Sequence, residues 1–309
     1  MYLNYKIFLY LFIIYIIIFI TKLDNLDKKC VYYLIKNINN LNLEASWKTY
    51  LESLYQSLLI PFKKKLYFER FTEGGIYSSY IYEYYPNLGI QMNDKLYWAN
   101  IFNKYNINHP KIICYKKYNK LIKLHNIDFN INYVKKPING ALGYNVDLIK
   151  GKDIINYSKS NYNFLVQEKL YDCIYGKARH FRAVTLYNGE LFVLYLLKSK
   201  KKNIIASNLA NGGAVVLCKN FICDELTNKQ QLYLNKFIKK LQNLHKKLYK
   251  NIISIGWDVM FNCNNINDLK CYCLEGNICA GIWNPDTKNI NIINSYKNIV
   301  QKFYCDNNI

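Results

Sequence analysis

Apolar and polar positions follow two different periods along this chain. Residues 254–262 and 270–277 each have the composition of a strand, and the polar segment 264–268 between them is rich in turn-forming residues. After Thr227, in contrast, apolar residues recur at the spacing of one face of a long helix, with Thr227 as its N-cap. These apolar residues are Leu234, Phe237, Ile238, Leu241, Leu244 and Leu248. The two periods predict a chain that contains both strands and helices.

Further strands are expected where short apolar runs are bounded by proline, glycine or asparagine. The strongest signal is Asn188-Gly189, a preferred two-residue hairpin turn, between strands at 179–187 and 190–198. The other predicted strands cover residues 112–115, 132–137, 144–149 and 164–168, and further helices are predicted from Asn93 or Asp94 to Tyr105 and over 292–303. Short strands and hairpins combined with two longer helices favour the α+β class over a doubly wound sheet.

The N-terminal segment has the pattern of a membrane anchor. Residues 7–20 are apolar without a break, and the wider run over 1–21 reaches the length of a bilayer span, interrupted only by Asn4 and Lys6. No small-residue cleavage site follows, so we expect an uncleaved transmembrane anchor over 1–21, with a cleaved signal peptide as the alternative. Lysines after the run mildly place the rest of the chain in the cytoplasm.

Charge suggests a polyanionic partner only weakly. The 309 residues carry a formal net charge of +21, from 42 Lys and Arg against 21 Asp and Glu. Nucleic acid or an anionic membrane would suit so basic a chain. The lysines are spread along the sequence, however, and no arginine-rich run or recognition helix stands out. We therefore expect a solvated lysine surface and no nucleic-acid partner.

The cysteines and histidines show no metal-binding spacing. The 10 Cys form no C-x-x-C pair, and the group Cys263, Cys271, Cys273 and Cys279 fits no zinc pattern. Buried thiols in a reducing compartment are the simplest expectation, with zinc and disulfides as alternatives. The 4 His form no paired motif either, and His180 is expected to be structural.

Candidate metal chemistry lies on the two strands near the C-terminus. If they fold about the midpoint of their loop, Asp258 and Glu275 face each other, an arrangement of like charges that is unfavourable unless a cation lies between them. Asn277 is two residues beyond Glu275 and shares its face of the strand. Two carboxylates and an amide oxygen are hard donors that suit Mg²⁺. The alternative is a surface hairpin with scattered acids.

Candidate phosphate contacts lie nearer the middle of the chain. Lys136 ends a strand just before a loop whose Gly140 and Gly143 would let backbone N–H groups approach a phosphate. Arg182 is one of three arginines in the chain, and arginine suits bidentate phosphate or carboxylate contact. Arg179 stands three residues earlier and would point to the opposite face of the same strand.

The order of these pieces resembles the ATP-grasp superfamily, and most closely its alpha-glutamate-ligase-like and sugar-transfer-associated members. The motifs that carry the resemblance are, in chain order, Asn93-Asp-Lys95-Leu, Tyr133-Val-Lys-Lys136-Pro137, Val166-Gln-Glu-Lys-Leu170, Phe181-Arg182-Ala-Val, Ser207-Asn208-Leu-Ala-Asn-Gly-Gly213, Gly256-Trp-Asp258 and Leu274-Glu275-Gly-Asn277. Each motif is weak alone, but seven in the family's order are specific.

The resemblance implies an ATP-grasp fold, in which two α+β subdomains hold ATP between them. Here the domain would cover 93–309, with a central lobe over 93–170 and a C-terminal lobe over 171–309. A short helical and aromatic region at 22–92 would stand where family members usually have a full α/β domain. The resemblance therefore implies no particular substrate.

The resemblance also implies roles for single residues in nucleotide binding. Two lysines would contact the phosphates, a glycine loop would close over them, a hinge would read adenine through backbone groups, and an acid would bind the ribose. In that order these residues are Lys95, Lys136, Asn139, Gly140, Gly143, Glu168, Lys169, Leu170 and Asp172. Asp258, Glu275 and Asn277 would hold one or two Mg²⁺ ions.

The implied activity is an ATP- and Mg²⁺-dependent ligation of a carboxylate to an amine through an acyl phosphate, near a membrane. Arg182, with Asn208 beside it, would stabilise the transferring phosphoryl group. The substrate pair is unknown, with a cell-surface glycan or peptide as one option. Two alternatives stay open: an ATP-grasp relative with another phosphoryl-transfer or nucleotide-binding role, and a basic, membrane-anchored protein that binds polyanions.

Overall fold

A computed structural model of the chain describes residues 86–139, 145–157, 159, 162–172, 179–198, 214–263, 268–278 and 290–307. Residues 88–280 form one compact unit, whereas 1–87 and 281–309 belong to a second unit. The predicted anchor over 1–21 and nearly all of the predicted region over 22–92 lie outside the described residues. Within the described ranges, no helix is both long enough and apolar enough to cross a membrane.

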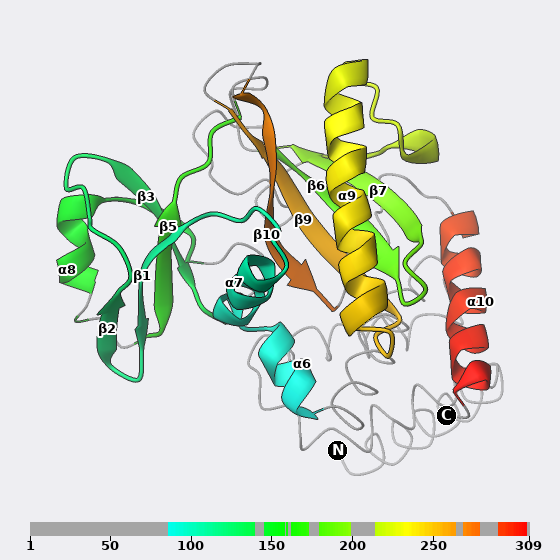
Figure 1. Cartoon of the computed structure of the whole chain (residues 1–309), viewed down its shortest axis with the longest axis horizontal. Coiled ribbons are helices and arrows are strands. Elements are labelled where there is room, and N and C mark those ends of the chain that lie inside the picture. The colour runs from blue at the N-terminus through cyan, green and yellow to red at the C-terminus, as the bar shows by residue number, and fades with distance from the viewer. Residues whose placement is uncertain are drawn as a thin grey trace, which may run out of the picture. The chain divides into compact units, whose positions relative to one another are not determined.

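Two five-stranded antiparallel sheets make up the larger unit (Figure 1). The first sheet has the order β2-β1-β5-β3-β4. Its strands are β1 Ile112–Lys117, β2 Lys120–Lys123, β3 Asn132–Pro137, β4 Asp147–Lys150 and β5 Phe164–Glu168. The second sheet has the order β10-β9-β6-β7-β8. Its strands are β6 Arg179–Leu186, β7 Leu191–Lys198, β8 Ala214–Leu217, β9 Ser254–Asn262 and β10 Lys270–Asn277.

The described residues form five α-helices, and two of them begin where the sequence predicts a cap. They are α6 Pro86–Met92, α7 Lys95–Lys104, α8 Ile154–Tyr157, α9 Asn228–Leu248 and α10 Ile290–Asp306, with 3₁₀ turns at Gly151–Asp153 and Lys219–Phe221. The Asp94 carboxylate accepts from the backbone N of Leu96 at 2.7 Å and so caps α7. Thr227 and Gln230 form a reciprocal capping box at the start of α9. The predicted α+β class is confirmed.

Most predicted elements match the structure, and four of the predicted strands have the predicted bounds. The misses are short elements: β2, β8, α6 and α8 were not expected, and β4 begins at Asp147 rather than at residue 144. The hairpin between β1 and β2 shows why. Its turn residues Tyr118 and Asn119 both have positive φ, of 51° and 63°, without any glycine to mark them.

The two faces of the first sheet bury different side chains. Tyr133 of β3 and Phe164 of β5 belong to a cluster on the side of α8, together with Ile154. Leu165, the next residue of β5, packs with Ala99 of α7 on the other side. Because side chains alternate along a strand, Lys135 and Lys136 also point to opposite faces. Lys136 shares the α7 face.

An aromatic cluster attaches α7 to the second sheet. The rings of Trp98 and Trp257 meet edge to face with centroids 5.2 Å apart, and Phe102 stacks on Trp98. Gly276 lies directly beneath them, because a Cβ at this position would come within 2.7 Å of the Trp98 ring. The glycine between Glu275 and Asn277 is therefore required for α7 to pack onto β10.

The cysteines differ from the expectation. Cys218 and Cys223 form a disulfide just after β8, and Cys263 is disulfide-bonded as well. Among the described cysteines, Cys114, Cys271 and Cys273 are free and buried, and Cys305 is free and exposed. The prediction of ordinary thiols was thus wrong for three positions, because spacing in the sequence does not report which side chains meet. Disulfides are typical of oxidising compartments, whereas the sequence led us to expect a reducing compartment for these cysteines.

Candidate functional site

The N-terminus of α7 is joined to the end of β3. Asp94 and Asn139 form an isolated antiparallel bridge, and the backbone N of Lys95 donates to the carbonyl of Ile138 at 3.1 Å. This junction brings Lys95 close to Lys136, and the two ammonium groups interact electrostatically. Two lysines that are 41 positions apart in sequence (136 − 95) thus belong to one site.

Three neighbouring strands of the second sheet carry a row of charged residues. Arg182 of β6 pairs with Asp258 of β9, and Asp258 pairs with Glu275 of β10. The predicted facing of Asp258 and Glu275 is confirmed. Register shifts between Cys273 and Glu275, so the sheet contains an irregularity immediately before the acidic residue.

Arg182 holds Asp258 through two contacts. Its Nε donates to Oδ1, and its Nη2 donates to Oδ2 at 3.0 Å. Burial by itself would raise the pKa of Asp258, but the charges of Arg182, His180 and Lys136 and the Arg182 hydrogen bond together outweigh it, so the pKa of the carboxyl lies below its usual value. Asn277 also donates from Nδ2 to Oδ2 of Asp258 at 3.4 Å, so it shares the face of the two acids as predicted.

The lysines meet the second acid. Lys95 Nζ lies 3.5 Å from Oε2 of Glu275. Lys136 is only 7% exposed, and its burial lowers the pKa of its ammonium group to about 8, against the attraction of Glu275. Three cations from different elements therefore converge on two carboxylates, which is the arrangement expected for a polyphosphate site.

His180 is a site residue that sequence analysis missed. Its Nε2 lies 3.5 Å from Oδ1 of Asp258, and burial lowers the pKa of its imidazole. The available signal was its position two residues before Arg182, which puts both side chains on one face of β6. Cys273 is a second such neighbour, since burial raises the pKa of its thiol and the charges of Asp258 and Glu275 raise it further.

The two acids suit a metal ion that takes its other ligands from phosphate and water. Among the residues that the structure describes, no three His, Cys, Asp or Glu side chains are close enough to hold a metal ion by themselves. Two carboxylates and the amide of Asn277 do converge, as shown above. Mg²⁺ is usually bound by one or two carboxylates plus substrate phosphates and water, so this donor set suits Mg²⁺ that arrives with a nucleotide.

The predicted adenine hinge connects the two sheets. Glu168 ends β5, where its backbone N donates to the carbonyl of Lys111 and its Oε1 accepts from the backbone N of Lys111, both at 2.9 Å. Lys169 is exposed and Leu170 is buried. Next along the chain, the carbonyl of Tyr171 accepts from the backbone N of Cys263 at 2.9 Å, which ties the segment to the end of β9.

Asp172 does not fit its predicted role as ribose-binding acid. Its side chain is 0% exposed, and both of its oxygens accept hydrogen bonds from Arg179. A carboxylate enclosed in this way has no surface for a ribose hydroxyl. The sequence suggested Asp172 only because it follows the hinge. Its actual partner is Arg179, which points to the face of β6 opposite Arg182.

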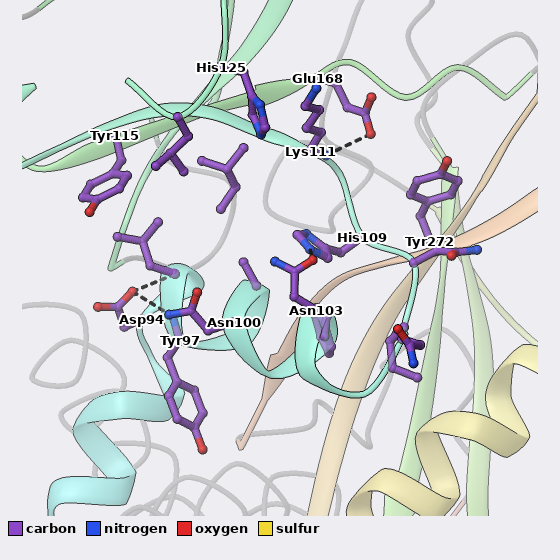
Figure 2. Close-up of a pocket in the computed structure, with 18 of the residues that line it drawn as sticks. Asp94, Tyr97, Asn100, Asn103, His109, Lys111, Tyr115, His125, Glu168 and Tyr272 are labelled. Carbon is purple, nitrogen blue, oxygen red and sulfur yellow. Dashed lines mark hydrogen bonds between the residues drawn. The ribbon is translucent and has the colours of Figure 1, made fainter. Parts of the chain in front are cut away.

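A wide cleft of about 960 Å³ lies on one side of α7 (Figure 2). Asn103, His109 and His125 point toward its middle, and of the predicted site residues only Glu168 lines it. A second cavity of about 10 Å³ is lined by Lys95, Lys136, Gln167 and Leu274 among others. We place the candidate site beside the small cavity, because Lys95 and Lys136 of the charged cluster line it and size alone does not supply chemistry.

Three predicted residues are not described. Gly140 and Gly143 of the glycine loop and Asn208 lie outside the described residues, while Asn139 stands at the edge of the described part and is exposed. Of the predicted set, the structure brings together Lys95, Lys136, Arg182, Asp258, Glu275 and Asn277.

Comparison with known proteins finds similarity in structure only. No protein-family model matches the sequence, and no curated protein matches it. The solved L-amino acid ligase from Bacillus licheniformis aligns with a TM-score of 0.42 and 12% identity, over 62% of this chain and 41% of that chain. D-alanine–D-alanine ligase from Bacillus anthracis, complexed with ATP, aligns with a TM-score of 0.43 and 15% identity, over 74% and 66%.

A third solved structure is the ATP-grasp ligase PsnB in complex with a phosphomimetic variant of its minimal precursor, Mg and ADP. It aligns with a TM-score of 0.45 and 11% identity, over 85% of this chain and 76% of that chain. The chain is similar in structure to these ligases, and it covers less than two thirds of the first two proteins' length. The roles of single residues therefore follow from the contacts within the site and not from these alignments.

Proposed function

We propose that this protein is an ATP- and Mg²⁺-dependent ligase that joins a carboxylate to an amine through an acyl phosphate. The observation that carries the proposal is the convergence of Lys95, Lys136 and Arg182 on Asp258 and Glu275. Separate elements supply these five groups, and Lys136 and Asp258 are buried while the other three are partly buried. Burial of charge is costly unless the charges pair with a ligand or with one another. A triphosphate with its metal satisfies both signs of charge at once.

The phosphates would lie against the lysines. Lys95 and Lys136 would neutralise phosphate oxygens, and Gly140 and Gly143, which lie outside the described residues, are the glycines predicted to let backbone N–H groups approach a phosphate. Adenine is bound at the hinge of residues 168–170, where backbone groups act as donors and acceptors. The small cavity at Lys136 has to widen for this, because about 10 Å³ holds no more than about one water molecule.

The reaction would proceed in two displacements. A carboxylate oxygen of the first substrate attacks the γ-phosphorus, the bond from that phosphorus to the bridging oxygen breaks, and ADP leaves. An amine nitrogen of the second substrate then attacks the acyl carbon, inorganic phosphate leaves with the carbon–oxygen electron pair, and the nitrogen loses a proton. Arg182, with Asn208, stabilises the charge that develops on the transferred phosphoryl group.

Mg²⁺, held by Asp258, Glu275 and Asn277, would supply charge neutralisation on the phosphates. The protein itself contributes position and electrostatics and no covalent step. Attachment to a membrane through residues 1–21 and the cytoplasmic orientation of the domain remain predictions.

The test is binding of Mg²⁺ and ATP to the full chain in detergent. The expected result is a rise in thermal midpoint with ATP and Mg²⁺ together that Asp258→Asn and Glu275→Gln each abolish. Asp147→Asn is the matched control, since this acid pairs with Lys135 on the other face of β3. The proposal is contradicted if the thermal midpoint of the wild-type protein does not change when ATP and Mg²⁺ are added.

One observation favours the polyanion-binding alternative. The solvent face of α9 and the second residue after its end carry seven exposed lysines, and α9 contains no acidic residue. These are Lys229, Lys236, Lys239, Lys240, Lys246, Lys247 and Lys250. A functional polyanion surface predicts binding to anionic vesicles that weakens steeply with salt and needs no Mg²⁺. If the protein does not bind anionic vesicles, or binds them equally well at high salt, the lysines of α9 form only a solvated surface.

A further inference from the structure

Protein groups lie against both oxygens of the Asp258 carboxylate, with three hydrogen bonds and one nearby imidazole. Oδ1 accepts from Arg182 Nε and lies 3.5 Å from His180 Nε2. Oδ2 accepts from Arg182 Nη2 at 3.0 Å and from Asn277 Nδ2 at 3.4 Å. A carboxylate offers about four lone-pair directions, so little acceptor capacity is left for a metal ion.

The other acid is compensated in the same way. Oε2 of Glu275 lies 3.5 Å from Lys95 Nζ, and the buried ammonium of Lys136 is attracted by the same carboxylate. Three cations thus face two carboxylates. A divalent cation that entered alone would add charge to a site that is already positive, and it would have to displace Arg182 from a bidentate contact.

We infer that Arg182 acts as an internal counter-ion that keeps Asp258 closed to divalent cations until a polyphosphate is bound. This inference rests on the proposed function. An arriving phosphate offers Arg182 a better anionic partner, and its negative charge compensates the lysines. When Arg182 turns to the phosphate, Asp258 becomes available to the metal ion, while His180 and Asn277 keep the carboxylate in place. Metal affinity is therefore conditional on nucleotide.

The shape of the site agrees with this exchange. The cavity beside Lys95 and Lys136 is about 10 Å³, so little open space is left around these two lysines. Arg182 keeps 19% of its side chain exposed, compared with 9% for Asp258. The arginine is thus the partner that can leave without passing through the core.

The experiment measures Mn²⁺ binding, as a spectroscopic substitute for Mg²⁺, by electron paramagnetic resonance on the full chain. Wild type should bind Mn²⁺ weakly alone and much more tightly with a non-hydrolysable ATP analogue. Arg182→Met should bind Mn²⁺ alone at least about tenfold more tightly than wild type, because a charge-assisted bidentate contact no longer competes. Lys135→Met, which removes a cation on the opposite face of β3, should behave as wild type.

A second readout covers the case in which Arg182→Met folds poorly. Removal of the guanidinium leaves a buried carboxylate without its counter-ion, so Mn²⁺ alone should raise the thermal midpoint of Arg182→Met but not of wild type. Arg182→Lys, which keeps the charge and loses the bidentate geometry, should fall between the two.

Two results would overturn the inference: equal Mn²⁺ affinity of wild type with and without the analogue, or unchanged metal-alone affinity in both arginine variants. Failure of the proposed function looks different, since wild type would then bind no nucleotide at all. In that case the metal-alone comparison between wild type and Arg182→Met still decides whether Arg182 closes Asp258.

Discussion

The two faces of strand β6 carry two arginine–aspartate pairs of nearly identical chemistry and different purpose. On one face, Arg179 and Asp172 are 2% and 0% exposed, and the guanidinium lies over the rings of Phe181 and Phe261. On the other face, Arg182 and Asp258 are 19% and 9% exposed. The first pair is enclosed by apolar rings, whereas the second stands among further charges and polar groups. The surroundings of an ion pair, rather than the pair itself, separate a structural role from a functional one.

The enclosed face also contains a buried hydrogen-bond chain. Trp257 Nε1 donates to Thr185 Oγ1 at 2.7 Å, the Thr185 hydroxyl donates to His245 Nδ1 at 2.7 Å, and His245 Nε2 donates to the carbonyl of Ile252 at 2.8 Å. Every group is satisfied with a neutral imidazole. This chain attaches α9 to β6 and β9 and leaves no group for a ligand.

The largest effect is expected from the enclosed pair. Asp172→Ala should lower the free energy of unfolding by about 3–5 kcal/mol, because Arg179 is left as a buried, uncompensated charge. Denaturant unfolding measures this. Asp147→Ala, which removes the exposed partner of Lys135, should cost less than Asp172→Ala, because Tyr162 still accepts from Lys135 Nζ. A small effect of Asp172→Ala would mean that the two faces do not differ as described.

The partly exposed pair, Arg182 and Asp258, should affect catalysis rather than stability. Asp258→Asn should lower the turnover of ATP to ADP by about 10²–10³-fold, since a group that stabilises developing charge contributes about 3–4 kcal/mol to catalysis. Coupled detection of ADP over a panel of carboxylates and amines would measure this. Turnover that is insensitive to Asp258→Asn would remove this acid from the site.

Acid should weaken the enclosed face through His245. Burial lowers the pKa of this imidazole to about 4, so the unfolded chain binds a proton more readily than the folded one. The stability that depends on a neutral His245 is fully present above about pH 6.5 and is lost as the pH falls toward about 4, by up to about 3 kcal/mol. His245→Gln should flatten that part of the profile. Denaturant midpoints across this pH range provide the check.

The smallest expected effect is a difference in nucleotide affinity between variants of two neighbouring lysines. Lys136→Met should weaken binding of ATP with Mg²⁺ by about tenfold or more, because a charge-assisted contact to phosphate is lost. Lys135→Met should leave that affinity unchanged, since Lys135 pairs with Asp147 and Tyr162 on the other face of β3. Isothermal titration of both variants measures the difference. Equal losses would show that general positive charge, and not the site, binds the nucleotide.

Several site features could be read from the sequence because they depend on neighbouring residues. The hairpin with Asp258 and Glu275 followed from two strand-like runs and a polar turn, and Asp94 was recognisable as a cap before Lys95. Asn277 shares the face of Glu275 through the two-residue period of a strand. Such signals are local, so one sequence contains them in full.

Tertiary structure alone decided which partners these residues have. Arg182 meets Asp258 because β6 pairs with β9, Asp172 is enclosed because Arg179 points to the other face, and His180 joins the site through its position on β6. The Cys218–Cys223 disulfide likewise depends on how the chain turns after β8. The sequence by itself determined the elements and their charged faces, whereas contacts between distant segments required the register of paired strands, which no local pattern encodes.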